Sequence, residues 1–216
     1  MPRFLSLLPL LLVCAAAAAA PLHYDINTVP TAVVLSWKVL GAGNSHADIT
    51  GITGRLDLNP RQDGNARVEV TIPVGNIDAH NGILSAELKS PLFFDQARYP
   101  NATFTSSRVV ADGKDQYKVF GTLQIKTISH PVILAAKLVS LNDPRSGERH
   151  LTFYADTAIA RSAFAMTRFI PMVSDRIAIH IMVTLPAPSV PSGTPASSLA
   201  VVSCHPFPVC PGQAGR

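Results

Sequence analysis

The sequence predicts an all-β protein, an eight-stranded antiparallel β-barrel with one short helix between two strands. Two observations support this prediction. Apolar and polar residues alternate in about eight separate runs, which places alternate side chains on opposite faces of a sheet. The connections are short and rich in Asn, Asp, Gly and Pro, with no helix alternating with the strands. Closure into a barrel removes exposed edges and leaves room inside for one small ligand. A sandwich of two sheets is the alternative architecture.

The first twenty residues set the expected compartment. Arg3 precedes an almost unbroken apolar run over 4–13, and the alanines at 15–20 offer small-residue cleavage sites. We therefore expect residues 1–20 to be a signal peptide and the mature protein to be periplasmic or secreted. Cys14 would suggest a lipoprotein, but Val13 stands where that signal needs a small residue.

Three strands are expected before the helix. A turn over 59–65 separates the second of them from the third. Their alternating apolar positions are Val33, Leu35, Trp37 and Val39; Leu56 and Leu58; and Val68, Val70, Ile72 and Val74.

A short helix is predicted over 81–92, where Ile83, Leu84, Leu88 and Leu92 recur at roughly helical spacing. It would end where Pro91 and the following aromatic pair begin. We expect it to lie against the barrel, either as a plug or lid or as a fixed closure of the core.

Five strands are expected after the helix, with turns over 111–115 and 142–147. Their apolar positions are Ala102 and Phe104; Tyr117, Val119, Leu123 and Ile125; the run 132–138; Leu151, Phe153, Ala155 and Ile159; and Ile177, Ile179, Ile181 and Val183.

The chain changes composition near residue 186. Prolines recur through 186–216, which favours a disordered tail after a single domain over 21–185. Cys204 and Cys210 could close a small disulfide loop within this tail, and a thiol or metal role with His205 is the alternative.

Charge and motifs exclude several classes of function. Lys and Arg number 18 against 14 Asp and Glu, and they are scattered, so no nucleic-acid partner is expected. Weak, transient contact with anionic membranes remains compatible with this charge. The histidines show no metal-ligand spacing, so we expect no bound metal. No nucleophile elbow or phosphate loop occurs, so we expect neither a cofactor nor enzymatic activity.

Several motifs in a fixed order resemble those of the YceI family over residues 24–185. The central one combines Phe93-Phe94-Asp95 with Tyr99-Pro100 and Phe104, and a late one is Arg161-Ser162-Ala163-Phe164. The resemblance implies an exported lipocalin-like barrel that holds an isoprenoid or another long-chain lipid, and possible homodimers.

Two departures from the family pattern concern polar residues. Pro30-Thr31 stands where such proteins usually carry His-Ser, and 84–88 replaces an Arg-Asp-x-His-Leu element. The departures affect any head-group contact that the absent His, Arg and Asp would make.

The predicted function is that of a carrier or sequestering protein for a polyisoprenoid, quinone or other long-chain lipid. A packed barrel acting as a protein-interaction or stress accessory module is the alternative, followed by a hydrolase-type enzyme. For each apolar candidate, simple core packing is the competing interpretation. Arg161 would meet a head group or pair with Asp156 or Asp175. The predicted lining residues are Trp37, Val70, Phe93, Phe94, Phe104, Leu123, Phe153, Phe164 and Ile179, with Arg161 as the polar candidate.

Overall fold

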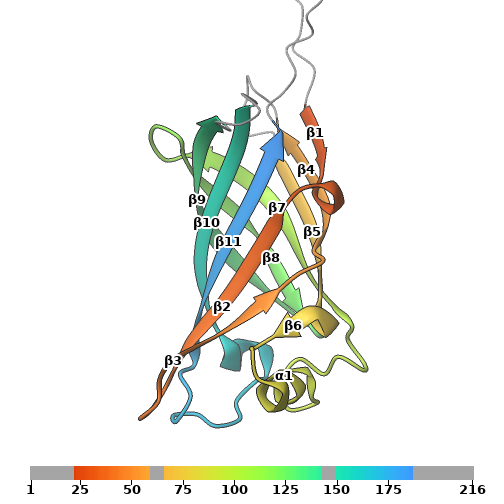
Figure 1. The fold of residues 1–216 in the computed structure, drawn as a ribbon, viewed down its shortest axis with the longest axis vertical. Coiled ribbons are helices and arrows are strands. Elements are labelled where there is room, and N and C mark those ends of the chain that lie inside the picture. The colour runs from red at the N-terminus through yellow and green to blue at the C-terminus, as the bar shows by residue number, and fades with distance from the viewer. Residues whose placement is uncertain (1–21, 59–65, 143–148, 187–216) are drawn as a thin grey trace, which may run out of the picture.

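The computed structural model describes residues 22–58, 66–142 and 149–186. Within these ranges one antiparallel sheet of eleven strands curls around an apolar interior, which confirms the predicted fold class (Figure 1). In order across the sheet, the strands are β1 (Leu22–Asp25), β4 (Thr53–Leu58), β5 (Arg67–Pro73), β7 (Asn101–Ala111), β8 (Gln116–Ile125), β9 (Ile128–Asn142), β10 (Arg149–Ala160), β11 (Arg176–Pro186), β2 (Thr31–Val39), β3 (Gly43–Ile49) and β6 (Ile77–Asp78).

The predicted number of strands was wrong, because the described sheet has eleven strands and not eight. All eight predicted strands are present, and β1, β3 and β6 are additional. β3 was missed because its sequence is largely polar and only Ala47 and Ile49 are buried. β6 has two residues, too few for any alternation to be visible.

Some predictions fall outside the ranges that the structure describes. These are the signal peptide, the turn over 59–65, residues 143–147 of the third predicted turn, and the tail beyond residue 186 with both of its cysteines. The turn over 111–115 is present and joins β7 to β8.

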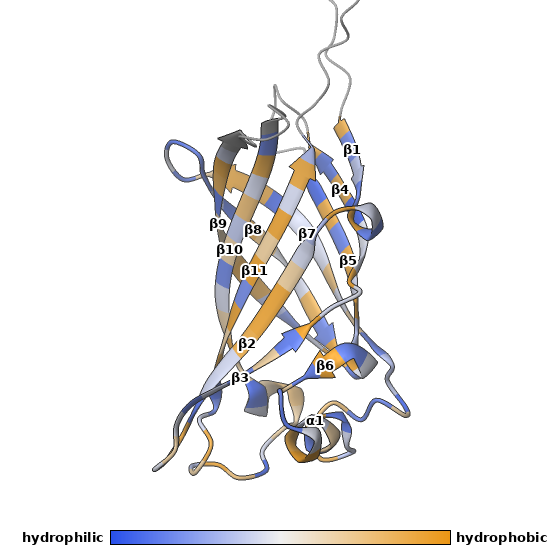
Figure 2. Cartoon of the chain, viewed as in Figure 1, coloured by the Kyte–Doolittle hydropathy of each residue, from blue (hydrophilic) through white to orange (hydrophobic). Residues whose placement is uncertain are grey.

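The alternation seen in the sequence is the inside–outside alternation of the sheet (Figure 2). In β8, Val119, Leu123 and Ile125 are buried, while Lys118 and Thr122 are exposed. The interior positions of neighbouring strands are in register, so their side chains form rows across the sheet.

A seam between β1, β2 and β4 is held by side chains. The 3-10 turn η1 (Ile26–Thr28) carries the chain from β1, which pairs with β4, to β2, which pairs with β11. Asn27 Oδ1 accepts a hydrogen bond of 3.1 Å from the Gly54 N–H. The side-chain amide thus replaces part of the missing strand ladder and keeps the interior covered.

The lower end of the barrel in Figure 1 is closed by short elements. They are α1 (Gly82–Lys89) and the 3-10 turns η3 (Val74–Asn76) and η4 (Arg161–Phe164). Asn81 caps α1 because its Oδ1 accepts hydrogen bonds of 3.0 Å from the backbone N–H groups of Ile83 and Leu84. Leu88 is buried, so α1 packs against the bottom of the core. This arrangement agrees with the expectation that the helix closes the core.

No helix within 22–58, 66–142 and 149–186 is long and apolar enough to cross a membrane.

Candidate functional site

The barrel interior holds an apolar cavity of about 420 Å³. This volume lies within the range of about 300–1,000 Å³ typical of small-molecule sites. On β10 the lining runs from Leu151 to Thr157, roughly 20 Å along the strand. The cavity is therefore long and narrow rather than spherical.

One row of interior residues explains why this space is not filled. The row crosses five strands, with Tyr117 opposite Ala136, Ala136 opposite Ala155, Ala155 opposite Ile181, and Ile181 opposite Val33. All five residues line the cavity. Two alanines side by side, where neighbouring rows carry larger residues, leave the barrel hollow at this level.

The cavity wall offers almost no polar atoms. Its only side chains with a polar atom, among the lining residues of the described ranges, are Thr31, Tyr117 and Thr157. The Thr31 hydroxyl donates to the Val29 carbonyl at 3.3 Å, and the Thr157 hydroxyl donates to the Ile133 carbonyl at 2.9 Å. Because no charged side chain lines the wall and both threonines are already bonded, an occupant would be held by apolar contact.

Tyr24 is a polar residue beside this wall. It lies two residues from Leu22 and two from Ile26, which both line the cavity, whereas Tyr24 itself is among the residues of a polar groove on the sheet. Its hydroxyl is buried and hydrogen bonds to nothing among the residues described, and burial raises the pKa of the phenol. An unpaired buried hydroxyl costs about 1–3 kcal/mol, which a polar group of a ligand could recover.

Five of the ten predicted site residues line the cavity, and the structure brings them together. They come from β5, β7, β8, β10 and β11 and are Val70, Phe104, Leu123, Phe153 and Ile179.

The other five predicted residues lie outside the cavity, in the packed base. Trp37 is buried at the lower end of β2, and Phe164 in η4 is 1% exposed and forms a T-shaped pair with the His130 ring, at 5.1 Å between ring centroids. Phe93 stacks on Phe169, and the Phe94 backbone N–H bonds to the Leu88 carbonyl at 3.1 Å. Alternation of apolar and polar residues identifies the side chains that point into the barrel. It does not show whether an inward side chain lines the cavity or belongs to the packed base.

Arg161, the fifth of these, is a structural residue of the base. The pairing expected with Asp156 or Asp175 is absent from the ion pairs of the described ranges. The guanidinium instead donates to the backbone carbonyls of Met166, Arg168, Val173 and Ser174, at 2.6 to 3.0 Å. Asp156 pairs with His180 on the outer surface.

Burial lowers the pKa of Arg161, and the nearby Asp175 carboxylate partly offsets that effect. Asp175 itself accepts from the Ser162 hydroxyl at 2.7 Å and the Ser162 N–H at 2.8 Å, and these bonds lower its pKa. A guanidinium satisfied by four carbonyls stabilises a loop and does not meet a head group.

Sequence reasoning missed the small lining residues. Ala136 and Ala155 line the cavity, and their small side chains leave space in it. The available signal was the presence of alanine at two inward positions of consecutive predicted strands.

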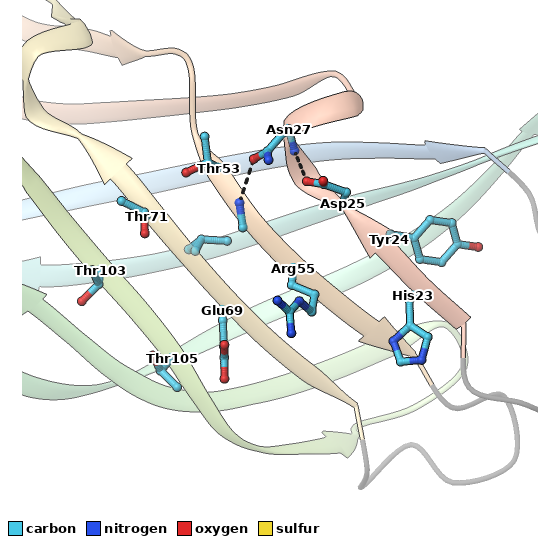
Figure 3. Close-up of a pocket in the computed structure, with 12 residues that line it drawn as sticks. His23, Tyr24, Asp25, Asn27, Thr53, Arg55, Glu69, Thr71, Thr103 and Thr105 are labelled. Atoms are coloured by element: carbon cyan, nitrogen blue, oxygen red, sulfur yellow. Dashed lines mark hydrogen bonds between the residues drawn. The ribbon is translucent and has the colours of Figure 1, made fainter.

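A second hollow, a polar groove of about 820 Å³, lies on the outer face of β1, β4, β5 and β7 (Figure 3). Threonines and charged residues from neighbouring strands line it, and Asp25, Arg55 and Glu69 follow one another in register. Asp25 accepts from the Asn27 N–H at 3.0 Å, so part of the groove supports η1. The groove contains no hydrogen-bonded pair of a nucleophile and a base among its described residues.

The described side chains form neither a metal site nor an acid–base pair in the cavity. No group of three His, Cys, Asp or Glu side chains there is placed to hold a metal ion. His23 with Asp57 and His180 with Asp156 are exposed pairs across neighbouring strands. Neither pair lines the apolar cavity.

Comparison with known proteins agrees with this architecture. The chain is 27% identical over 167 residues to a UPF0312 protein of Pectobacterium carotovorum, which covers 77% of this chain and 86% of that protein. It is 26% identical over 174 residues to protein YceI of Escherichia coli O157:H7, covering 80% and 91% of the two chains.

Solved structures share the fold. BcnA of Burkholderia cenocepacia superposes with a TM-score of 0.64 at 22% identity, covering 72% of this chain and 96% of BcnA. A polyisoprenoid binding domain from Saccharophagus degradans superposes with a TM-score of 0.55 at 12% identity, covering 73% and 94%. The family model of the YceI-like domain matches residues 24–185, and the chain therefore belongs to the YceI family.

Proposed function

We propose that the protein binds one long-chain lipid, such as a polyisoprenoid or a quinone, inside the barrel and acts as an exported carrier or sequestering protein. The observation that carries the proposal is the cavity wall: an elongated space whose described lining is aliphatic and aromatic apart from two threonines and one tyrosine. A related fold in Saccharophagus degradans is described as a polyisoprenoid binding domain, which supports the same class of ligand.

The energetics favour a chain over a compact polar ligand. Each methylene buried contributes about 0.8 kcal/mol, so a chain with ten buried methylenes would gain roughly 8 kcal/mol before the cost of ordering it. No specific polar contact is needed for that gain. The Tyr24 hydroxyl, which hydrogen bonds to no described residue, is our candidate partner for a polar end group.

We do not propose that the protein changes the bound lipid chemically. The Ser162 hydroxyl is bound to Asp175 in the base, and the exposed His–Asp pairs lie outside the cavity wall. Binding and release are the steps we expect.

Native mass spectrometry of the protein purified from its own cells, followed by organic extraction, tests the proposal. We expect one isoprenoid, quinone or fatty-acyl species bound per chain. A mass equal to that of the bare polypeptide, with no uptake of added long-chain lipids, would contradict the carrier function and favour a barrel that acts through its surface.

A further inference from the structure

Two loops at the lower end of the barrel expose a group of large apolar side chains. We call this group the tip and define it as Leu40, Phe169, Ile170 and Met172. Leu40 is 79% exposed, Met172 57%, Ile170 40% and Phe169 39%. The β2–β3 turn and the segment 165–175 that carry them project together at the lower left of Figure 1.

Backbone hydrogen bonds fix the two loops to each other. The Leu40 N–H donates to the Met172 carbonyl at 2.8 Å, and the Ser174 N–H donates to the Lys38 carbonyl at 2.9 Å. Val39 and Val173 form an isolated antiparallel bridge between them. Leu40 and Met172 are therefore held side by side, although they lie far apart in the sequence.

The buried arginine of the base supports the same segment. Arg161 is 3% exposed, and all four of its acceptors are carbonyls of residues 166–174. Phe169 stacks on the buried Phe93 ring at 6.4 Å between centroids. The apolar side chains are thus presented by a braced loop, so little conformational entropy would be lost when they contact a partner.

The two loops that carry the tip have an excess of basic residues. Lys38 and Arg168 are exposed, and Asp175 is the only acidic residue within 38–43 and 165–175. Both Asp175 carboxylate oxygens accept hydrogen bonds from Ser162, which turns this acid toward the barrel. The exposed charges beside the apolar residues are therefore basic.

We propose that the tip is a docking surface for an anionic lipid bilayer, into whose interface these four side chains insert. A projecting group of aliphatic and aromatic residues flanked by basic side chains has the chemistry of interfacial anchors. Each Lys or Arg near an anionic bilayer surface adds attraction that salt weakens. The tip is convex, so it suits insertion into a fluid interface better than a groove that receives a protein segment.

Docking at the tip is independent of what the cavity holds. The packed base with Trp37 and Phe164 lies between the tip and the cavity lining. A docked barrel would have its base toward the bilayer and the strand ends at Leu58 and Arg149 away from it. Docking to a membrane and binding of a lipid in the cavity are therefore separate properties, and either one can be absent without the other.

Vesicle flotation tests the docking surface. The full-length protein would be mixed with vesicles of equimolar phosphatidylglycerol and phosphatidylcholine, and in parallel with pure phosphatidylcholine vesicles. We expect flotation with the anionic vesicles that falls on going from about 0.05 M to about 0.5 M salt. Leu40→Ser with Met172→Ser should reduce the bound fraction roughly tenfold or more, because two exposed apolar side chains are removed.

Two controls make the result specific. Ile133→Ser with Met182→Ser removes two exposed apolar residues from the barrel wall and should leave flotation unchanged. Ala136→Trp, which fills the cavity, should also float as the wild type does, so lipid uptake cannot explain the signal. Flotation that persists in the tip variant would overturn the proposal by placing the membrane contact elsewhere on the protein. A wild type that floats with neither vesicle would overturn it as well and would favour a protein partner for the tip.

Discussion

Gly121 shows how one interior residue shapes the cavity. It is buried in β8, and the Phe104 ring of the neighbouring strand lies where a Cβ of residue 121 would stand. The Thr105 carbonyl is also close to that point. Phe104 lines the cavity in this position, so the missing side chain at 121 allows the ring to lie flat against the wall.

Gly121→Ala should lower the free energy of unfolding by about 1–3 kcal/mol, because the new methyl group would displace the Phe104 ring and crowd backbone. Urea denaturation followed by circular dichroism measures the change. Gly82→Ala is the control: no atom stands within 4 Å of its Cβ position at the start of α1, so stability should stay equal or rise slightly. An unchanged midpoint for the Gly121 variant would show that the ring moves freely.

Residue identity in the cavity was predictable only in part. Alternation predicts Val70, Phe104, Leu123, Phe153 and Ile179, and they line the space. Trp37 has the same kind of inward strand position but fills the base, as does Phe164 in η4. The height of a residue along the barrel depends on the stagger between strands and on what covers each end, and neither is visible in a local pattern.

At the scale of elements, the segment between η4 and β11 is the part that sequence reasoning described least well. Its conformation depends on contacts from one buried guanidinium to four carbonyls and from Asp175 to Ser162. Such contacts have no period in the sequence. The strands, by contrast, were predictable wherever one face met the core and the other met water, as in β8.

Asp175→Asn should destabilise the protein at neutral pH, and the loss should shrink in acid. Hydrogen bonds from Ser162 lower the pKa of Asp175 in the folded state, so its ionised form stabilises the fold above the unfolded value of about 3.9. That contribution disappears as the pH falls through the folded-state pKa. Asparagine does not titrate, so the two proteins should converge.

Urea denaturation at about pH 7 and about pH 3 measures this difference. Asp112→Asn is the matched control, because Asp112 forms an exposed ion pair with Lys118 at 2.8 Å and should contribute little to stability. A stability difference between wild type and Asp175→Asn that is the same at both pH values would contradict the role given to the Asp175 carboxylate.

At the scale of the whole molecule, the barrel has two parts with different packing. Trp37, Phe164 and the elements that cover the lower end form a packed base, and the rest of the interior is hollow around Ala136 and Ala155. The eight predicted strands account for most of this architecture, and the added β1, β3 and β6 complete the sheet at its two margins. The curled sheet and the elements at its lower end together surround an apolar interior.

We expect the lipid chain to lie in the cavity around Ala136 and Ala155. A matched pair of tryptophan variants tests this expectation most directly. Ala136→Trp would project into the cavity, whereas Ala135→Trp, at the exposed neighbouring position on β9, would project outward. Both proteins would be titrated with a long-chain isoprenoid alcohol and their binding compared with that of the wild type. Thermal melts would verify folding, and Ala155→Leu offers a smaller obstruction if Ala136→Trp does not fold.

We expect Ala135→Trp to bind one chain with the affinity of the wild type and Ala136→Trp to bind at least roughly tenfold more weakly, since the indole occupies space that several methylenes would fill. Equal binding by a folded Ala136→Trp, or by a folded Ala155→Leu, would contradict the claim that the chain lies in this cavity.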